Sequence, residues 1–408
     1  MLTGRAWRDF EPAWVGEVDS DALPERIVTP GAGTARAYAR ARLLIRRGIE
    51  PLGLVELALD RGVAEAQTLA AAISEQVPDS EGDAVPAGHG PLPPFSVVVC
   101  THERVASLRA TIESVLAADQ GALELLVVDS APAGNATREL VESIGDSRLR
   151  YRREAIPGLS RARNLGIALA ASELIAFTDD DVVVDRWWLR QLAVAFGRSP
   201  RVGAVTGLAL AVELETPAQA YFEAAVGWSS RFAARVFDSE HRGAKALFPY
   251  AAGELGAGVN FAVRRATFGR VGQFDEALGA GTPARGGEDL DFLARVILAG
   301  ETIAYEPSAL VWHRHRRDIS ALRAQMFGYG SGLSAYAFKH LLHGGAVRAL
   351  PGAARAALAD RLTPAARVRV SSPRAPALRA LELAGLACGP WLYRRGKSAA
   401  QGIKSAAG

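Results

Sequence analysis

Residues 174–181 read LIAFTDDD, an apolar run that ends in three consecutive aspartates. Two similar runs precede it, FSVVVCT at 95–101 and LELLVVD at 123–129, and stretches of helical composition at 105–119 and 159–171 separate the three runs. Continuous apolar runs are typical of strands that are buried on both faces of a parallel sheet. The alternation therefore predicts an α/β fold with a Rossmann-like, mainly parallel sheet that is flanked by helices.

All three runs end in polar side chains, namely Thr101, Asp129 and Asp179. Ligands of open parallel sheets bind at the edge where the strands end, although a single strand-end Asp is more often a cap or turn residue. Alternate residues of an extended chain share a face, so Asp179 and Asp181 point together. Close carboxylates repel each other unless a cation neutralises them, and oxygen ligands suit Mg²⁺ or Mn²⁺. The triplet predicts a divalent-metal site, and a solvated acidic turn is the alternative.

The composition is that of a globular protein. The 408 residues are 49% hydrophobic and 22% charged, which excludes wholesale disorder and collagen-like repeats. Two cysteines cannot build a disulfide framework or a Cys-rich zinc site, and they indicate a reducing compartment. The net charge of +3 hides an asymmetry, because residues 319–408 hold thirteen Lys or Arg and two acidic residues. This basic tail either rests on an anionic membrane or packs on the core with solvated arginines.

Composition also divides the chain into segments. We expect a small α+β unit at 1–78, a linker rich in Pro, Gly and acidic residues at 79–94, an α/β domain at 95–318 and a basic helical region at 319–408. The longest run without a charged residue, 324–338, is shorter than the ~20 apolar residues of a membrane-spanning helix. The start of the chain lacks a signal-peptide core. The expected location is the cytoplasm or the periphery of the cytoplasmic membrane face.

Six stretches of the predicted α/β domain form one ordered set of motifs. They are FSVVVCTHER (95–104), LLVVDSAP (125–132), GLSRARNLGIALAASELIAFTDDD (158–181), GAGVNFAVRR (256–265), GGEDLDFLARVILAGETIAYEP (286–307) and VWHRH (311–315). In order and spacing they resemble the family 2 glycosyltransferases, inverting enzymes of the GT-A fold. The resemblance implies transfer of a sugar from a nucleotide-diphosphate sugar to an acceptor hydroxyl, assisted by Mn²⁺ or Mg²⁺. It also implies a UDP- or dTDP-type donor and an acceptor of unknown identity, and it makes nucleic acid an improbable partner.

The resemblance also assigns roles by position. The implied donor-binding residues are Thr101, Glu103, Arg104, Asp129, Arg163, Asn164, Asp179 and Asp180. The implied metal ligands are Asp179, Asp181 and His313, and the implied acceptor contacts are Gly258, Asn260 and Glu288. Asp289 would be the base that takes the proton of the acceptor hydroxyl, with Glu288 beside it in the catalytic pair. From the residues alone, Glu288 and Asp289 could instead be favourable charges in the first turn of a helix, and HRHRR (313–317) a solvated basic stretch.

Two other functions fit parts of the sequence. A sugar nucleotidyltransferase would carry a Gly-rich phosphate loop after its first strand, and THERV at 101–105 contains no glycine. A non-catalytic nucleotide-sugar-binding protein would not need an intact set of Asp179, Asp181 and Asp289. The glycines of GAGVN at 256–260 have the wrong spacing for a dinucleotide-binding fingerprint, which argues against a dehydrogenase.

Overall fold

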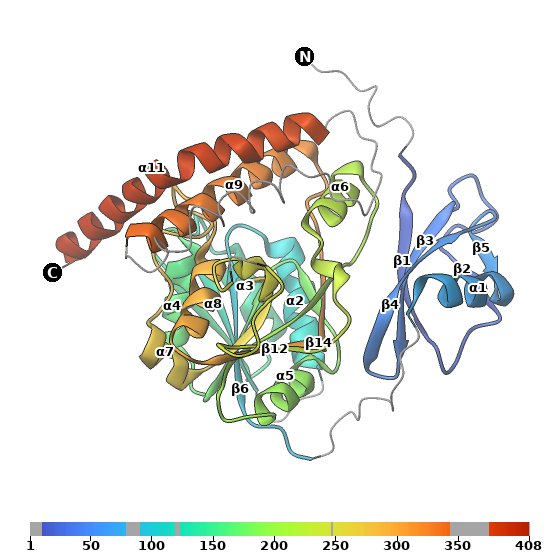
Figure 1. Cartoon of the computed structure of the whole chain (residues 1–408), viewed down its shortest axis with the longest axis horizontal. Coiled ribbons are helices and arrows are strands. Elements are labelled where there is room, and N and C mark those ends of the chain that lie inside the picture. Colours follow the sequence, from blue (N-terminus) through green and yellow to red (C-terminus); the bar gives the residue numbers. More distant parts are fainter. Residues whose placement is uncertain (1–9, 79–89, 119–122, 246–247, 343–374, 408) are drawn as a thin grey trace.

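The computed structural model describes residues 10–78, 90–118, 123–245, 248–342 and 375–407. Figure 1 shows three parts, namely a small N-terminal unit, a central sheet between helices, and two long C-terminal helices that lie side by side. Of the predicted linker at 79–94, residues 79–89 lie outside the described part of the chain.

The central sheet confirms the mainly parallel α/β prediction. Its main path runs through β10 (Val182–Val184), β14 (Thr302–His313), β11 (Val202–Ala211), β13 (Asn260–Arg264), β9 (Leu174–Asp179), β6 (Phe95–Thr101), β7 (Leu123–Ser130) and β8 (Leu149–Glu154), and β12 (Arg235–Phe237) pairs with β14. The neighbouring strands β8, β7, β6 and β9 are parallel, as are β11 and β14. Strands β10, β12 and β13 pair with their neighbours in the antiparallel sense.

Both faces of this sheet are buried, as the continuous apolar runs predict. Val97 and Val99 of β6 pack with α2, α3 and α5, whereas Val98 between them packs on the opposite face with α4, α7 and α8. Successive side chains of a strand alternate between faces, so a two-sided core requires an apolar residue at every position. The helices are α2 (Val105–Ala117), α3 (Ala136–Ile144), α4 (Leu159–Leu169), α5 (Trp188–Gly197), α7 (Arg265–Val271) and α8 (Glu288–Leu298).

The N-terminal unit packs on the central sheet through one face of its strand β3. The unit consists of β1 (Ala13–Asp19), β2 (Arg26–Val28), β3 (Arg40–Arg47), β4 (Glu50–Ala58), β5 (Val63–Glu65) and α1 (Ala66–Gln76). Leu43 packs with Leu69 of α1 inside the unit, whereas Leu44 packs with Leu208 and Leu310 of the central sheet. Side chains alternate along β3, so its even-numbered residues lie on the face that packs against the central sheet.

The described parts of the basic C-terminal region, 319–342 and 375–407, are helical, as predicted, and pack on the α/β domain; residues 343–374 lie outside the described part of the chain. The two helices are α9 (Ile319–Leu342) and α11 (Ala375–Ala407), and α6 (Pro217–Val226) lies beside α9. Glycines allow close approach here, because a Cβ atom at Gly330 or Gly385 would collide with the facing helix backbone. Gly332 of α9 is pressed against Gly286, just before α8 begins. Helix α9 thus supports the segment around Gly286, which directly precedes the predicted catalytic pair at the start of α8.

Candidate active site

The strands that carry the predicted site residues end at one edge of the sheet. Thr101 ends β6, Asp179 ends β9 and His313 ends β14. Strand β9 is parallel to β6, and β13 reverses direction between β9 and β11, so β11 and β14 run in the same direction as β9. His313 therefore meets the Asp triplet although more than one hundred residues separate them in the chain.

Asp179, Asp181 and His313 form a group that could hold a metal ion. Their ligand atoms all lie within 4.8 Å of one another. Asp181 Oδ1 is buried 3.3 Å from His313 Nε2 and accepts no hydrogen bond from the residues that the structure describes. A buried carboxylate oxygen without a donor is an expensive arrangement unless a cation completes it. Two carboxylates and an imidazole suit Mn²⁺ or Mg²⁺ and so fit the predicted metal.

Asp180 does not belong to the possible metal-binding group, because its carboxylate is hydrogen-bonded to other side chains of the protein. Its carboxylate accepts hydrogen bonds from the Thr101 hydroxyl at 2.7 Å and from Arg104 Nη1 at 2.9 Å. Burial and the neighbouring Asp181 carboxylate raise the pKa of Asp180 to about 6. Arg104 also donates to Asp181 Oδ2 at 2.8 Å, and Arg316 lies 3.3 Å from the same oxygen. These two guanidinium groups place positive charge beside the metal group.

A cavity of about 270 Å³ opens at this edge of the sheet. The predicted donor residues that line it are Thr101, Arg104, Asp179 and Asp180. Arg316 also lines it, although the sequence assigned only a general role to the basic stretch around it. Oxygen acceptors and guanidinium groups therefore line the cavity at the ends of β6 and β9. A nucleotide diphosphate needs such cations for its phosphate oxygens.

Two other predicted donor residues line neither this cavity nor the larger one next to it. The Glu103 carboxylate accepts the N–H of Ala133 at 2.8 Å, and the residue has a left-handed φ of 56°. Asp129 is fully buried at the end of β7, where its Oδ2 accepts the Tyr151 hydroxyl at 3.2 Å. Its Oδ1 atom has no hydrogen-bond partner in the described ranges, and burial raises the pKa of this carboxyl.

A larger cavity of about 1030 Å³ adjoins the first and contains the predicted catalytic pair. Asp289 Oδ2 accepts the N–H of Gly258 at 2.8 Å, and its Oδ1 accepts the N–H of Leu290 at 2.8 Å. A Cβ atom at position 258 would lie only 2.7 Å from Asp289 Oδ2, so glycine is required for this approach. Burial and the adjacent Asp289 carboxylate raise the pKa of Glu288 to about 7.

Arg163 connects the two halves of the site. Its guanidinium group is buried, donates to Glu288 Oε1 at 3.0 Å and to the Gly258 carbonyl at 2.9 Å, and lies 3.5 Å from Asp179 Oδ1. One cation thus bridges a carboxylate of the metal group and a carboxyl of the catalytic pair.

Two predicted contacts need correction, because the side chains point away from both cavities. Asn164 follows Arg163 on α4, and both ends of its amide bond the backbone of Phe274 at 2.9–3.0 Å. Consecutive helical residues face different directions, so the two side chains cannot both reach the donor. Asn260 is fully buried, accepts the Trp188 indole N–H at 2.8 Å and donates to the carbonyls of two strands. It connects strands of the sheet and lines neither cavity.

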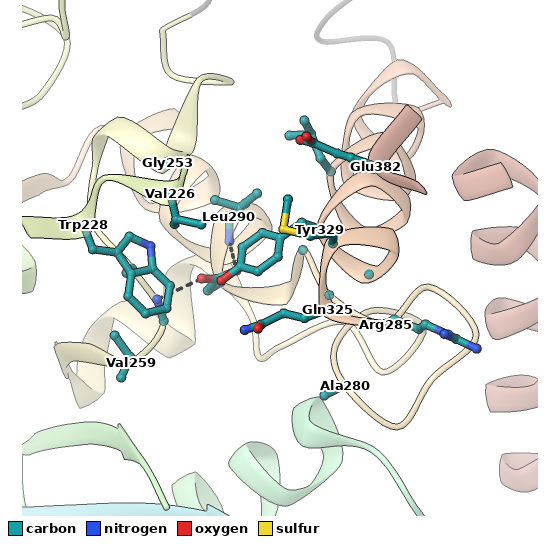
Figure 2. A pocket seen from close by; sticks show the side chains of 18 of the residues that line it. Val226, Trp228, Gly253, Val259, Ala280, Arg285, Leu290, Gln325, Tyr329 and Glu382 are labelled. Atoms are coloured by element: carbon teal, nitrogen blue, oxygen red, sulfur yellow. Dashed lines mark hydrogen bonds between the residues drawn. The ribbon is translucent and has the colours of Figure 1, made fainter. Parts of the chain in front are cut away.

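The walls of the larger cavity come mainly from segments outside the family motifs. Figure 2 shows the rings of Trp228 and Tyr329 turned toward the cavity, the first from the short helix η2 (Trp228–Ser230) and the second from α9. Val226 of α6, Leu290 of α8 and Glu382 of α11 line it as well. Sequence reasoning missed Tyr329 and Glu382, because α9 and α11 were assigned to a separate basic tail. It missed Val226 and Trp228, because they lie between two of the family motifs, and it gave Leu290 no role although this residue lies within a motif.

Comparisons with known proteins agree with this architecture. Residues 96–221 match the family described as glycosyl transferase family 2. The pre-mycofactocin glycosyltransferase of Mycobacterium tuberculosis is 33% identical over 184 residues, which cover 45% of this chain and 36% of that protein. The inactive polypeptide N-acetylgalactosaminyltransferase-like protein 5 of Macaca fascicularis is 27% identical over 260 residues, which cover 60% of this chain and 57% of that protein. The chain thus spans between about one third and somewhat more than half of the length of these two relatives.

A solved structure has the same fold. It is the mannosyltransferase PcManGT from Pyrobaculum calidifontis in complex with GDP-Man and Mn²⁺. It matches with a TM-score of 0.50 and 18% identity over 74% of this chain and 88% of that chain.

Proposed function

Because the chain carries a glycosyl transferase family 2 domain on a GT-A fold, we propose that it transfers a sugar from a nucleotide-diphosphate sugar to an acceptor hydroxyl with inversion. The observation that carries this proposal is the arrangement around Arg163. Asp179 of the metal-binding group lines both cavities, and the predicted catalytic pair lines the larger one. The buried Arg163 guanidinium donates to Glu288 and forms an ion pair with Asp179 at 3.5 Å. A donor and an acceptor that occupy adjoining cavities are held together, which removes much of the entropic cost of reaction.

Asp179, Asp181 and His313 would hold the metal, Mn²⁺ or Mg²⁺. When bound, the metal supplies a Lewis acid that neutralises the charge on the departing nucleoside diphosphate. Arg104 and Arg316 flank Asp181 and would bind the diphosphate oxygens directly. The resemblance to the family favours a UDP- or dTDP-type donor, but Asp129 is fully buried and lines neither cavity, so the geometry assigns it no part in this preference.

We assign the general base to Asp289. Two backbone N–H groups orient its carboxylate, and such positioning within hydrogen-bond reach of a hydroxyl is what a general base needs. Glu288 has a pKa of about 7, because burial and the Asp289 charge favour its protonated form. Near neutral pH a large share of Glu288 therefore carries a proton, which suits a hydrogen bond to an acceptor hydroxyl better than proton abstraction.

Donor binding tests the proposal. We expect UDP- or dTDP-sugars with Mn²⁺ to raise the melting temperature by several degrees at saturation, since a ligand at 100 times its Kd adds ~2.7 kcal/mol to folding stability. Incubation with a sugar 1-phosphate and a nucleoside triphosphate should release no pyrophosphate. Pyrophosphate release would instead indicate a nucleotidyltransferase. One relative is named as inactive, so donor binding without hydrolysis or transfer would favour a non-catalytic nucleotide-sugar-binding protein.

The exposed face of α11 suggests where the acceptor resides. Leu383 is 47% exposed and lines the larger cavity, and Trp391 is 59% exposed under the guanidinium of Arg395. Among the described residues, no helix has both the length and the apolarity that crossing a bilayer requires. An exposed apolar stripe with flanking cations is typical of a helix that lies on an anionic membrane surface. We therefore propose a lipid-linked acceptor that is presented at a membrane.

The double variant W391S/R395E should bind vesicles that contain phosphatidylglycerol at least ~10-fold more weakly than the unmodified protein, because each basic residue near an anionic surface contributes ~1 kcal/mol. Cosedimentation measures this. The matched control is Leu298→Ser, which removes a 51%-exposed leucine from α8 and should leave vesicle binding unchanged. Equal sedimentation of all three proteins would show that α11 is a helical cap with solvated arginines.

A further inference from the structure

A chain of buried hydrogen bonds runs from the metal-binding group into the N-terminal unit. His313 Nδ1 lies 2.8 Å from His315 Nδ1, and His315 Nε2 lies 2.9 Å from Glu223 Oε2 on α6. Arg42 of β3 donates to Glu223 Oε1 at 2.9 Å. The side chains of His315 and Glu223 are only 2% and 5% exposed. Four side chains thus connect the site to a unit to which the sequence assigned no role.

The hydrogen-bond partners determine which nitrogen atoms carry protons when both imidazoles are neutral. Glu223 as a carboxylate can only accept, so His315 Nε2 donates to it. His315 Nδ1 then accepts a hydrogen bond from His313 Nδ1–H. The lone pair of His313 remains on Nε2, the atom that faces Asp181 at 3.3 Å. This is the tautomer that a metal ligand needs, and ligating histidines usually donate their other N–H to such a partner.

The far end of the chain depends on the charge of Arg42. Burial raises the pKa of Glu223, but the hydrogen bond from His315 and the charge of Arg42 lower it further, and the net shift is downward. The hydroxyl of Ser229 also donates to this carboxylate. A buried carboxylate that loses its cationic partner is strongly destabilised as an anion. Arg42 therefore keeps Glu223 ionised, so that its carboxylate accepts the His315 Nε2–H bond. This bond fixes which nitrogen atoms of His315 and His313 carry protons.

We propose that Arg42 is a positioning residue of the metal site, and that the N-terminal unit orients His313 through Glu223 and His315. This inference rests on the proposed metal-dependent function. It gives the N-terminal unit a specific role, because its strand β3 provides the cation that pairs with Glu223. Asp179 ends β9 and Asp181 lies in the turn between β9 and β10, so these two ligands are held within the central domain.

Arg46 provides a matched control on the same strand face. Its Nη1 atom donates to Asp185 Oδ2 of the catalytic domain at 2.9 Å and lies 3.0 Å from Glu17 Oε2. It thus holds the N-terminal unit in place through an ion pair, as Arg42 does, but it forms no bond to Glu223 or to the two histidines in the described structure. Loss of Arg46 should weaken the contact between the N-terminal unit and the catalytic domain, but it removes no hydrogen bond among Arg42, Glu223, His315 and His313.

The test is the Mn²⁺ affinity of the full chain without nucleotide, measured by electron paramagnetic resonance of free Mn²⁺. We expect Arg42→Met to weaken Mn²⁺ binding by ~10- to 100-fold, the usual cost of losing a partner behind a metal ligand. Arg46→Met should stay within about twofold of the unmodified protein, and Arg42→Lys should restore part of the loss. Circular dichroism checks folding. If Arg42→Met does not fold, Glu223→Met, which removes the acceptor for His315 Nε2–H, should show the same weakening.

The outcomes separate the inference from the function on which it rests. Equal Mn²⁺ affinity of Arg42→Met and the unmodified protein would overturn the inference and leave the proposed metal function intact. Equal weakening by Arg42→Met and Arg46→Met would also overturn it, since general docking would then be the cause. Absence of Mn²⁺ binding by the unmodified protein would overturn the metal assignment itself, and the inference with it.

Discussion

Replacing Asp289 with asparagine should reduce sugar transfer by at least ~10²-fold, the usual contribution of a general base, while nucleotide-sugar binding persists. An amide cannot take the hydroxyl proton, but it keeps the shape of the side chain and one oxygen for the N–H of Gly258 or Leu290. The measurement compares kcat/KM for transfer with the donor Kd from calorimetry.

Glu288→Gln is the matched comparison for this prediction. Since burial and Asp289 raise the pKa of Glu288 to about 7, a neutral amide resembles the form that is abundant near neutral pH. The amide oxygen can also keep the bond from Arg163. We expect a loss of less than about tenfold, below the range of general-base removal. The reverse order, with Glu288→Gln more damaging than Asp289→Asn, would move the base to Glu288.

Removal of divalent metal should abolish detectable transfer, and Asp181→Asn should lower it by about 10³-fold or more. Stabilisation of the leaving diphosphate by a metal contributes several kcal/mol, and each 1.36 kcal/mol is a factor of ten in rate. Asp181 is the member of the group whose buried oxygen has no hydrogen bond from the described residues, so it should bind the cation strongly. Transfer assays after chelation and after return of Mn²⁺ measure the effect.

Asp185→Asn serves as the control for Asp181→Asn. It also removes a buried negative charge, four residues further along the chain, but its carboxylate bonds Arg46 and the backbone of Trp187 and not the metal group. Its transfer rate should remain within a few-fold of the original. Full activity in excess chelator would contradict the metal role of Asp179, Asp181 and His313.

The sequence alone determined the fold class and the sheet edge where the site lies. The run LIAFTDDD became β9 and its polar end, and FSVVVCT and LELLVVD became the neighbouring strands β6 and β7. This succeeded because strand burial is a local property. A strand between two helical layers is apolar at most positions, because both of its faces are buried, and neighbouring parallel strands direct their carboxyl ends to one edge. Asp179 and Asp181 followed from the aspartate triplet itself, whereas His313 relied on motif resemblance, and the structure brings their ligand atoms together.

The tertiary structure decided which side chains complete the site. Asn164 and Asn260 matched motif positions, but helix phase and strand packing turn them into the core. Tyr329 lines the larger cavity because α9 packs against the loop before α8. Arg42 reaches Glu223 because β3 docks its even-numbered face on the central sheet. Such contacts join residues far apart in the chain, and they depend on how whole elements pack, which no local pattern of residues encodes.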